Sequence, residues 1–254
     1  MVAEGGDLCM SVVDERTDVL GRFSTALYTV PEAARYLDVP TSTLNSWAHG
    51  YRNHPPGRRE AVGAPILTTL PRRAIRLPII PFIGLAEGAV LTAIRRSGVP
   101  MQRIRPALEQ LDTQIGLSHA LASRRLYTDG AEVLFDYAEA TDDPGLVRAA
   151  RDLVVVRNGQ RVFNEVVAAY LRRLEFDDHG YVRLIRLPAY EVAEIVVDPT
   201  RGFGQPIFVR GGARLEDALG LFRAGEPLDV VADEYGIPSD HLEDAVRIAT
   251  RSAA

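Results

Sequence analysis

The chain has 254 residues and a formal net charge of −5 at neutral pH, and it contains no lysine. This length is enough to bury the cores of about two or three small domains, and the mild negative charge excludes a general polyanion-binding protein. The single cysteine, Cys9, excludes an internal disulfide, and there is neither a signal-peptide pattern nor an apolar run long enough to cross a membrane. We therefore expect a soluble cytoplasmic protein with a flexible lead-in over residues 1–27.

Residues 28–47 have the pattern of two short helices joined by a tight turn. Thr29 and Glu32 are spaced as a capping box, and Pro31 occupies the first turn, so a helix is predicted to begin here. The helix is expected to end at Asp38, because the residues before Pro40 avoid the helical region and Asp tolerates a left-handed conformation. Two helices joined in this way predict a helix-turn-helix.

The second helix of this pair is predicted to have one apolar and one polar face. Thr41 or Ser42 is expected to cap it, and Leu44 and Trp47 lie at the spacing of a buried stripe. The short polar side chains between them are suited to contact a DNA surface. The candidate DNA-binding residues of this helix are Thr41, Ser42, Thr43, Asn45 and Ser46.

Positive charge is concentrated around this motif. Between Tyr28 and Arg76 there are seven arginines and three acidic residues, as expected where phosphate contacts supply affinity. The segment after the second helix is rich in Gly, Pro and Arg, and we predict a loop or a short β-ribbon wing, then a short strand over residues 66–70 and a linker. The resulting winged helix-turn-helix spans residues 28–80. The further candidate DNA-binding residues are His49, Tyr51, Arg52, Arg58 and Arg59.

Residues 81–190 are predicted to form a middle α+β module. Apolar residues recur at helical spacing over residues 83–94 and 101–115, which indicates two helices. Asp129-Gly130 predicts a β-hairpin turn. A second hairpin is predicted through Asn158-Gly159, the alternative being a helix that begins at Gln160, and a strand closes the module near residue 184.

Residues 191–254 are predicted to form a C-terminal trihelical, helix-turn-helix-like domain that follows two short strands. The GFGQP sequence from Gly202 precedes a strand and not a helix, which excludes a phosphate-binding glycine loop. Between Arg214 and Thr250 there are nine acidic residues and three arginines, so this region is expected to meet protein and not DNA, unless its acidic surface is simply solvated. The predicted fold class is mainly α with small β elements, an α+β protein.

No arrangement of residues indicates catalysis, a metal site or a cofactor. The histidines have no metal-ligand spacing, there is no second cysteine, and no nucleophile-elbow motif is present. We therefore expect that the protein is not an enzyme. The five histidines are His49, His54, His119, His179 and His241.

Three segments carry a resemblance to a known group of proteins. YTVPEAARYLDVPTSTLNSW is similar to the helix-turn-helix of the MerR/excisionase class, and VDPTRGFGQPIFVRGGARLEDALGLFRAGEPLDVVADEYGIPSDHLEDAVRIA resembles the small C-terminal domain of antitoxins from VapBC-type toxin–antitoxin modules. The middle segments FIGLAEGAVLTAIRRSGVPMQRIRPALEQL and SHALASRRLYTDG fit the same antitoxins. Two departures are Asp38, where the family usually has Gly, and Asn45-Ser46, where many relatives have arginines.

The resemblance implies an antitoxin that forms a homodimer, binds operator double-stranded DNA to repress its own promoter, and binds a PIN-domain ribonuclease toxin. Arg210 and Arg214 are candidate toxin-binding residues, because a guanidinium pairs well with carboxylates that otherwise hold magnesium. The alternative for both is an ordinary turn with solvated arginines. The alternative function is a stand-alone MerR-like transcriptional regulator without a toxin partner, whose middle module holds a ligand or forms the dimer interface.

Overall fold

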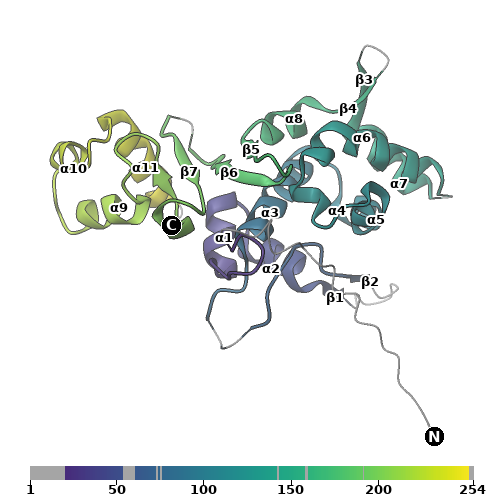
Figure 1. Ribbon diagram of the computed structural model, residues 1–254, viewed down its shortest axis with the longest axis horizontal. Helices are drawn as coiled ribbons and strands as arrows, with labels where there is room; N and C mark the ends of the chain where they lie inside the picture. Colours follow the sequence, from purple (N-terminus) through teal and green to yellow (C-terminus); the bar gives the residue numbers. More distant parts are fainter. Residues whose placement is uncertain are drawn as a thin grey trace, which may run out of the picture.

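A computed structural model describes residues 21–53, 61–72, 74, 76–141, 143–157, 160–190 and 192–251. This part of the chain is mainly helical with small antiparallel sheets (Figure 1), which confirms the predicted fold class. Its helices are α1 (Val30–Leu37), α2 (Thr41–His49), α3 (Phe82–Arg96), α4 (Met101–Glu109), α5 (Leu111–Ile115), η1 (Ala120–Ala122), α6 (Arg124–Glu139), α7 (Pro144–Leu153), α8 (Glu165–Leu171), η2 (Gly202–Gly204), α9 (Leu215–Arg223), α10 (Leu228–Tyr235) and α11 (Ser239–Arg251). Its strands are β1 (Tyr51–Asn53), β2 (Ala61–Gly63), β3 (Val154–Arg157), β4 (Gln160–Phe163), β5 (Leu174–Phe176), β6 (Val182–Arg186), β7 (Ile195–Val197) and β8 (Ile207–Phe208). None of the described helices is long and apolar enough to cross a membrane.

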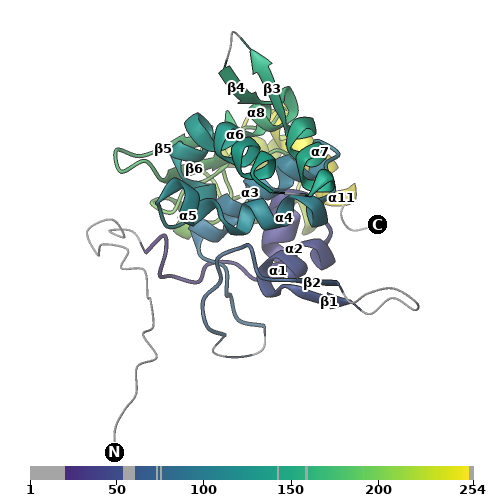
Figure 2. The same ribbon diagram turned by 90° about the vertical axis from the view of Figure 1, so that its right-hand side faces the viewer.

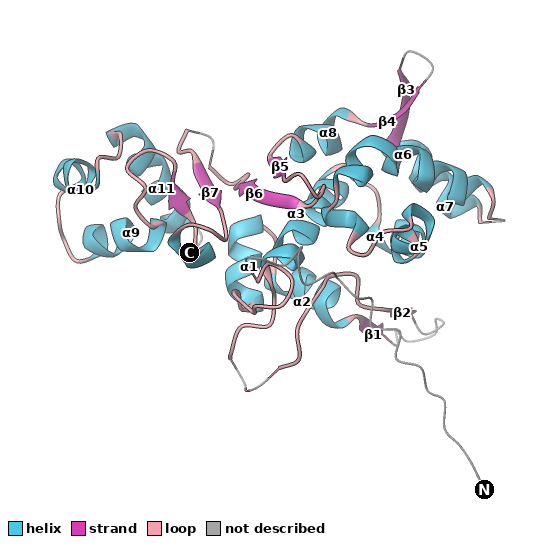
Figure 3. Cartoon of the chain, in the orientation of Figure 1, coloured by secondary structure: helices cyan, strands magenta, loops and turns pink. Residues whose placement is uncertain are grey.

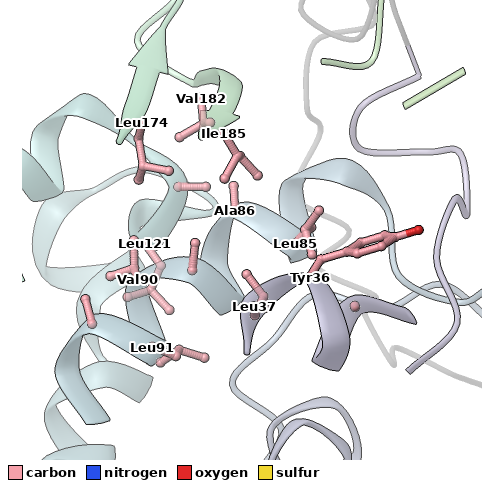
Figure 4. Close-up of a cluster of buried hydrophobic side chains, with 14 of the residues drawn as sticks. Tyr36, Leu37, Leu85, Ala86, Val90, Leu91, Leu121, Leu174, Val182 and Ile185 are labelled. Atoms are coloured by element: carbon pink, nitrogen blue, oxygen red, sulfur yellow. The ribbon is translucent and has the colours of Figure 1, made fainter. Parts of the chain in front are cut away.

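Helix α3 is the centre of the hydrophobic core. Every residue from Phe82 to Ile94 is buried, as expected for a helix with apolar residues on all sides, and Glu87 and Thr92 are its buried polar residues. Helices α1, α8 and η1 and strand β6 pack around it, and Figure 4 shows buried side chains of α1, η1 and β6 beside those of α3. Gly88 makes the close contact with α1 possible, because a Cβ atom there would lie 2.6 Å from Leu37 Cδ1, and Leu44 Cδ1 of α2 lies 3.7 Å from the same position. The helix-turn-helix is therefore seated directly on α3.

A four-stranded antiparallel sheet, in the order β5-β6-β7-β8, connects the middle and C-terminal parts of the chain (Figure 3). In its register Ile185 of β6 lies opposite Val197 of β7. The predicted boundary at residue 190 falls between these two strands. The two predicted C-terminal strands and three helices are present as β7, β8 and α9 to α11.

The two hairpin predictions in the middle region have opposite outcomes. The hairpin at Asp129-Gly130 is wrong, because both residues lie inside the continuous helix α6. Gly130 is buried, and a Cβ atom there would lie 2.7 Å from Leu126 Cδ1, so the Leu126 side chain packs over the bare backbone; Phe163 Cζ of β4 lies 3.4 Å from the same position. The second hairpin is confirmed by the pairing of β3 with β4, although its turn, residues 158–159, lies outside the described residues. The alternative helix from residue 160 is wrong, because α8 begins at Glu165.

Three other expectations also need correction. The strand predicted over residues 66–70 does not form, because the N–H groups of Ile66 and Leu70 bond to the carbonyls of Trp47 and Ile79, and that of Thr68 bonds to the Glu87 carboxylate. The helix predicted over residues 101–115 is divided at Gln110, whose N–H bonds to the carbonyl of Ala107, three residues earlier, and not to that of the fourth residue before it, as in an α-helix. The flexible lead-in predicted over residues 1–27 is too long, because Arg22 is buried and pairs with Asp177 at 2.6 Å. Residues 1–20 lie outside the described part of the chain.

Candidate nucleic-acid interface

The first helix of the motif begins and ends where the sequence predicts. The Thr29 hydroxyl accepts the N–H of Glu32, and the Glu32 carboxylate accepts the N–H of Thr29 at 2.8 Å, which confirms the capping box. Asp38 ends the helix in the left-handed conformation, with φ of 53°. Its carboxylate pairs with Arg96 of α3, so the tight turn is fastened to the central helix.

The second helix begins differently from the prediction. Thr41 is its first residue, and Pro40 occupies the capping position without any side-chain cap. The carbonyl of Pro40 accepts the N–H groups of Thr43 and Leu44 at 2.9 and 3.2 Å. The predicted cap by Thr41 or Ser42 is therefore wrong. Both residues already lie inside the helix, and the capping position is taken by Pro40. Both side chains are exposed at the first turn of α2.

Helix α2 has one face in the core and one in solvent. Leu44 and Trp47 are 0% and 1% exposed, which confirms the predicted buried stripe. Thr43 and Ser46 are half-buried, and the Ser46 hydroxyl donates to the Thr43 carbonyl at 2.8 Å, so it is used within the helix. The exposed face consists of Thr41, Ser42, Asn45 and His49.

The predicted wing is a two-stranded ribbon formed by β1 and β2. Arg52 is exposed and lies opposite Val62, which is also exposed. Tyr51 is half-buried, and its ring covers Gly63 so closely that a Cβ atom there would lie 2.4 Å from a ring carbon. The ring of Tyr51 is thus occupied by contacts inside the ribbon. Arg58 and Arg59 lie outside the described residues.

Arg105 of α4 holds the base of this ribbon. Its guanidinium donates to the Ala64 carbonyl and lies 5.2 Å from the centre of the Tyr51 ring. Burial lowers the pKa of Arg105, and the nearby Tyr51 and Glu109 oppose that shift. Sequence reasoning missed this residue, because its only signal is an arginine within an apolar helical repeat.

A groove runs along the exposed face of α2. It has a volume of about 370 Å³ and lies between the start of α1, the outer face of α2 and the loop that follows Leu70. Arg72 and Arg76 of this loop share the groove with the predicted DNA-binding residues. Sequence reasoning counted these two arginines as local charge but assigned them to a linker. The residues that combine the predicted face with the loop are Thr41, Ser42, Asn45, Arg72, Arg76 and Leu77.

The two candidate toxin-binding arginines lie elsewhere, in the turn before α9. The Arg214 guanidinium forms two parallel bonds with Asp217, from Nε to Oδ2 at 2.8 Å and from Nη2 to Oδ1 at 2.9 Å. Arg210 is exposed at the end of β8. The start of α9 lies away from α2 (Figure 1), and of these two arginines Arg214 is the one with a bidentate carboxylate partner within the described chain. Within that same part of the chain, no three His, Cys, Asp or Glu side chains are grouped so as to hold a metal ion.

The two short helices, the turn and the paired ribbon define a DNA-binding helix-turn-helix protein. Residues 26–108 match the model of a family described as "Putative DNA-binding HTH domain". The chain is also 48% identical over 228 residues to "Putative antitoxin VapB45" of Mycobacterium tuberculosis, an alignment that covers 89% of this chain and 94% of the relative. The chain therefore belongs to the VapB45 family.

Two further comparisons, both with Mycobacterium tuberculosis, also extend over most of the chain. The uncharacterized protein Rv2308 is 27% identical over 229 residues, which is 87% of this chain and 88% of that protein. The crystal structure of Rv2018 superposes with a TM-score of 0.76 at 46% identity, covering 89% of this chain and 99% of the other. The similarity thus extends well beyond the helix-turn-helix, into the middle and C-terminal parts of the chain.

Proposed function

We propose that this protein is an antitoxin that binds operator DNA through α2 and the β1–β2 ribbon and neutralises a ribonuclease toxin through other parts of the chain. The observation that carries the DNA-binding half is the division of α2 into a buried face and an exposed face of hydroxyl, amide and imidazole side chains. The antitoxin half is supported by the similarity to VapB45.

The exposed face of α2 has the chemistry needed to read a major groove. Asn45 carries both a donor and an acceptor and is suited to the adenine edge, while Thr41 and Ser42 can bond to bases or phosphates. Arg52 on the ribbon supplies a cation for the flanking backbone. A homodimer would bring two such helices to half-sites about one helical turn apart, which suits repression of the module's own promoter.

The toxin would be a PIN-domain ribonuclease bound by the middle and C-terminal parts. The region from Arg214 to Thr250, with nine acidic residues and three arginines, would repel DNA and so leaves its surface to a protein partner. Arg210 is the stronger candidate to reach acidic side chains of the toxin, because Arg214 is already paired with Asp217.

Co-expression with the product of the adjacent gene tests this function. The expected result is a complex in gel filtration, loss of ribonuclease activity in the complex, and a specific shift of the promoter fragment by the antitoxin. Asn45→Ala serves as a separating control, because it should impair DNA recognition and leave ribonuclease inhibition intact. A specific DNA shift without any toxin complex would instead favour a stand-alone MerR-like regulator.

A further inference from the structure

The loop between Leu70 and Ile79 is a second arm beside the helix-turn-helix. It and the β1–β2 ribbon extend on the same side of the molecule and flank α1 and α2 in both views (Figures 1 and 2). The base of the loop is closed by a hydrogen bond from the Leu70 N–H to the Ile79 carbonyl at 2.7 Å. Ile79 and Ile80 are buried, and their N–H groups both point to the Tyr28 carbonyl at 3.0 Å. The loop is therefore anchored to the same core as α1.

The loop carries positive charge, and its two described arginines are exposed to solvent. Residues 71–79 include three arginines and no acidic residue. Arg72 and Arg76 are exposed, and neither has an ion-pair partner among the residues that the structure describes. Arg96, by contrast, is neutralised by Asp38 on the other side of the same motif. The two loop arginines are thus available to an anionic partner.

The backbone of the loop is also under local strain. Arg76 has φ of 72°, in the left-handed region that non-glycine residues rarely occupy. The following residue, Leu77, is 48% exposed. Strain of this kind persists only where the surrounding structure imposes it, here between the buried anchor at Ile79 and the turn in which the Leu77 N–H faces the Ala74 carbonyl at 3.4 Å. The turn holds Arg76 at the groove beside α2.

We propose that Arg72 and Arg76 of this arginine loop grip the sugar–phosphate backbone of the bound DNA on the side of α2 opposite the ribbon. The proposal rests on the proposed DNA-binding function and extends it to a second backbone contact. A phosphate strand suits the groove because Arg72 and Arg76, whose guanidinium forks match phosphate, line it together with the hydroxyl-bearing Thr41 and Ser42. Among the described lining residues none is a carboxylate, and exposed Leu77 offers an apolar surface to a deoxyribose.

The charge contribution is tested with the double variant Arg72→Ala/Arg76→Ala in the full chain, titrated against the promoter fragment and against unrelated DNA at several salt concentrations. Two lost phosphate contacts should make the slope of log affinity against log salt shallower by about 2 and weaken binding to both DNAs alike. The matched control is Arg148→Ala/Arg151→Ala, which removes the same charge from the exposed side of α7, a helix packed against α4 and α6. The control should keep the wild-type slope to within about half a unit.

Hydroxyl-radical footprinting tests the position of the loop. The loop variant should lose backbone protection at one edge of each half-site, and Arg52→Ala should lose it at the other edge. Thermal unfolding verifies that the variants are folded, and Arg72→Gln/Arg76→Gln replaces the alanine pair if they are not. A wild-type slope and footprint in a folded loop variant, or loss at the same edge as Arg52→Ala, overturns the inference while the proposed function stands. Absence of DNA binding by the wild-type protein overturns both.

Discussion

The hydroxyl of Tyr28, just before α1, donates a 2.6 Å hydrogen bond to the backbone carbonyl of Gly204, 176 residues further along the chain. Tyr28 is fully buried, and burial raises the pKa of its phenol, so the hydroxyl remains a donor at all ordinary pH values. Nearby, the Tyr36 hydroxyl donates to Gln205 Oε1 at 3.0 Å. The glycine-rich turn at Gly202–Gly204 therefore acts as a docking point that joins the helix-turn-helix to the C-terminal part.

Replacing Tyr28 with Phe should lower the free energy of unfolding by about 1–2 kcal/mol, because the Gly204 carbonyl loses its buried partner. Urea denaturation measures the change. Tyr36→Phe is the matched control: Gln205 is only half-buried, so water can replace the lost hydroxyl and the expected loss is below about 1 kcal/mol. Equal losses in the two variants would contradict a special role for the buried pair.

Gly204→Ala should destabilise the protein through both conformation and packing. Gly204 has φ of 74°, and a Cβ atom there would lie 2.9 Å from Leu27 Cδ1 and 3.2 Å from the Tyr28 hydroxyl. The left-handed conformation alone costs an alanine about 1–2 kcal/mol. Gly212→Ala isolates that part, because Gly212 has φ of 71° and nothing within 4 Å of its ideal Cβ. In urea denaturation, Gly204→Ala should therefore lose more unfolding free energy than Gly212→Ala. The difference between the two losses measures the contribution of packing at the docking point.

Mutations on the buried face of α2 should lower stability, whereas mutations on its exposed face should change DNA recognition. Trp47→Ala removes a large buried ring and should cost about 3–5 kcal/mol of stability, measured by denaturant unfolding. Asn45→Ala should leave stability within about 0.5 kcal/mol, since the side chain is exposed, but change the preference among operator sequences in a binding-site selection. An Asn45→Ala protein with unchanged sequence preference would remove this residue from the proposed reading face.

Local signals in the sequence were sufficient where neighbours in the chain decide the structure. The capping box at Thr29 and the stripe of Leu44 and Trp47 concern residues within about two helical turns, so their spacing predicts them. The turn signal at Gly130 failed because the residue is buried inside α6, where Leu126 of the same helix and the distant Phe163 pack over it. Tertiary contacts can override local preference in this way.

The same limit applies to the candidate interface. The exposed polar residues of α2 follow from helical periodicity, which the sequence contains. The place of Arg72 and Arg76 beside them does not, because it depends on the hydrogen bond between Leu70 and Ile79 that folds the loop back on α2. The anchoring of the ribbon by Arg105 likewise depends on the packing of α4.

The stability of the protein should depend on the protonation of His119. Its Nδ1 lies 3.0 Å from Oε1 of Glu87, a buried residue of α3 that also accepts the hydroxyl of Thr68 at 2.8 Å. Burial acts to lower the pKa of His119, but the hydrogen bond to Glu87 and the charges of Glu87 and Asp112 outweigh it and raise the pKa above its ordinary value. A raised pKa means that the folded state binds the proton more tightly than the unfolded state.

The stabilisation from this proton is therefore complete below the unfolded pKa, about 6.5, and is lost as the pH rises through the folded value. In urea titrations from about pH 6 to pH 8, the unfolding free energy of the wild type should fall more than that of His119→Gln. His179→Gln, at an exposed position, is the control and should keep the wild-type dependence. If the unfolding free energies of the wild type and His119→Gln change in parallel with pH, the pair with Glu87 does not contribute this pH-dependent stability.

The two arginines before α9 should differ in their effect on the toxin complex. Arg214 is already paired bidentately with Asp217, so engaging a toxin carboxylate would require breaking that pair, whereas Arg210 can engage one directly. In titrations of ribonuclease inhibition, Arg210→Ala should raise the dissociation constant about tenfold or more, and Arg214→Ala should have a smaller effect. Asp217→Asn weakens the internal pair and should increase the contribution of Arg214, so that Arg214→Ala costs more affinity in that background. If Arg210→Ala inhibits the ribonuclease as well as the wild type, the toxin is held by a different surface of the chain.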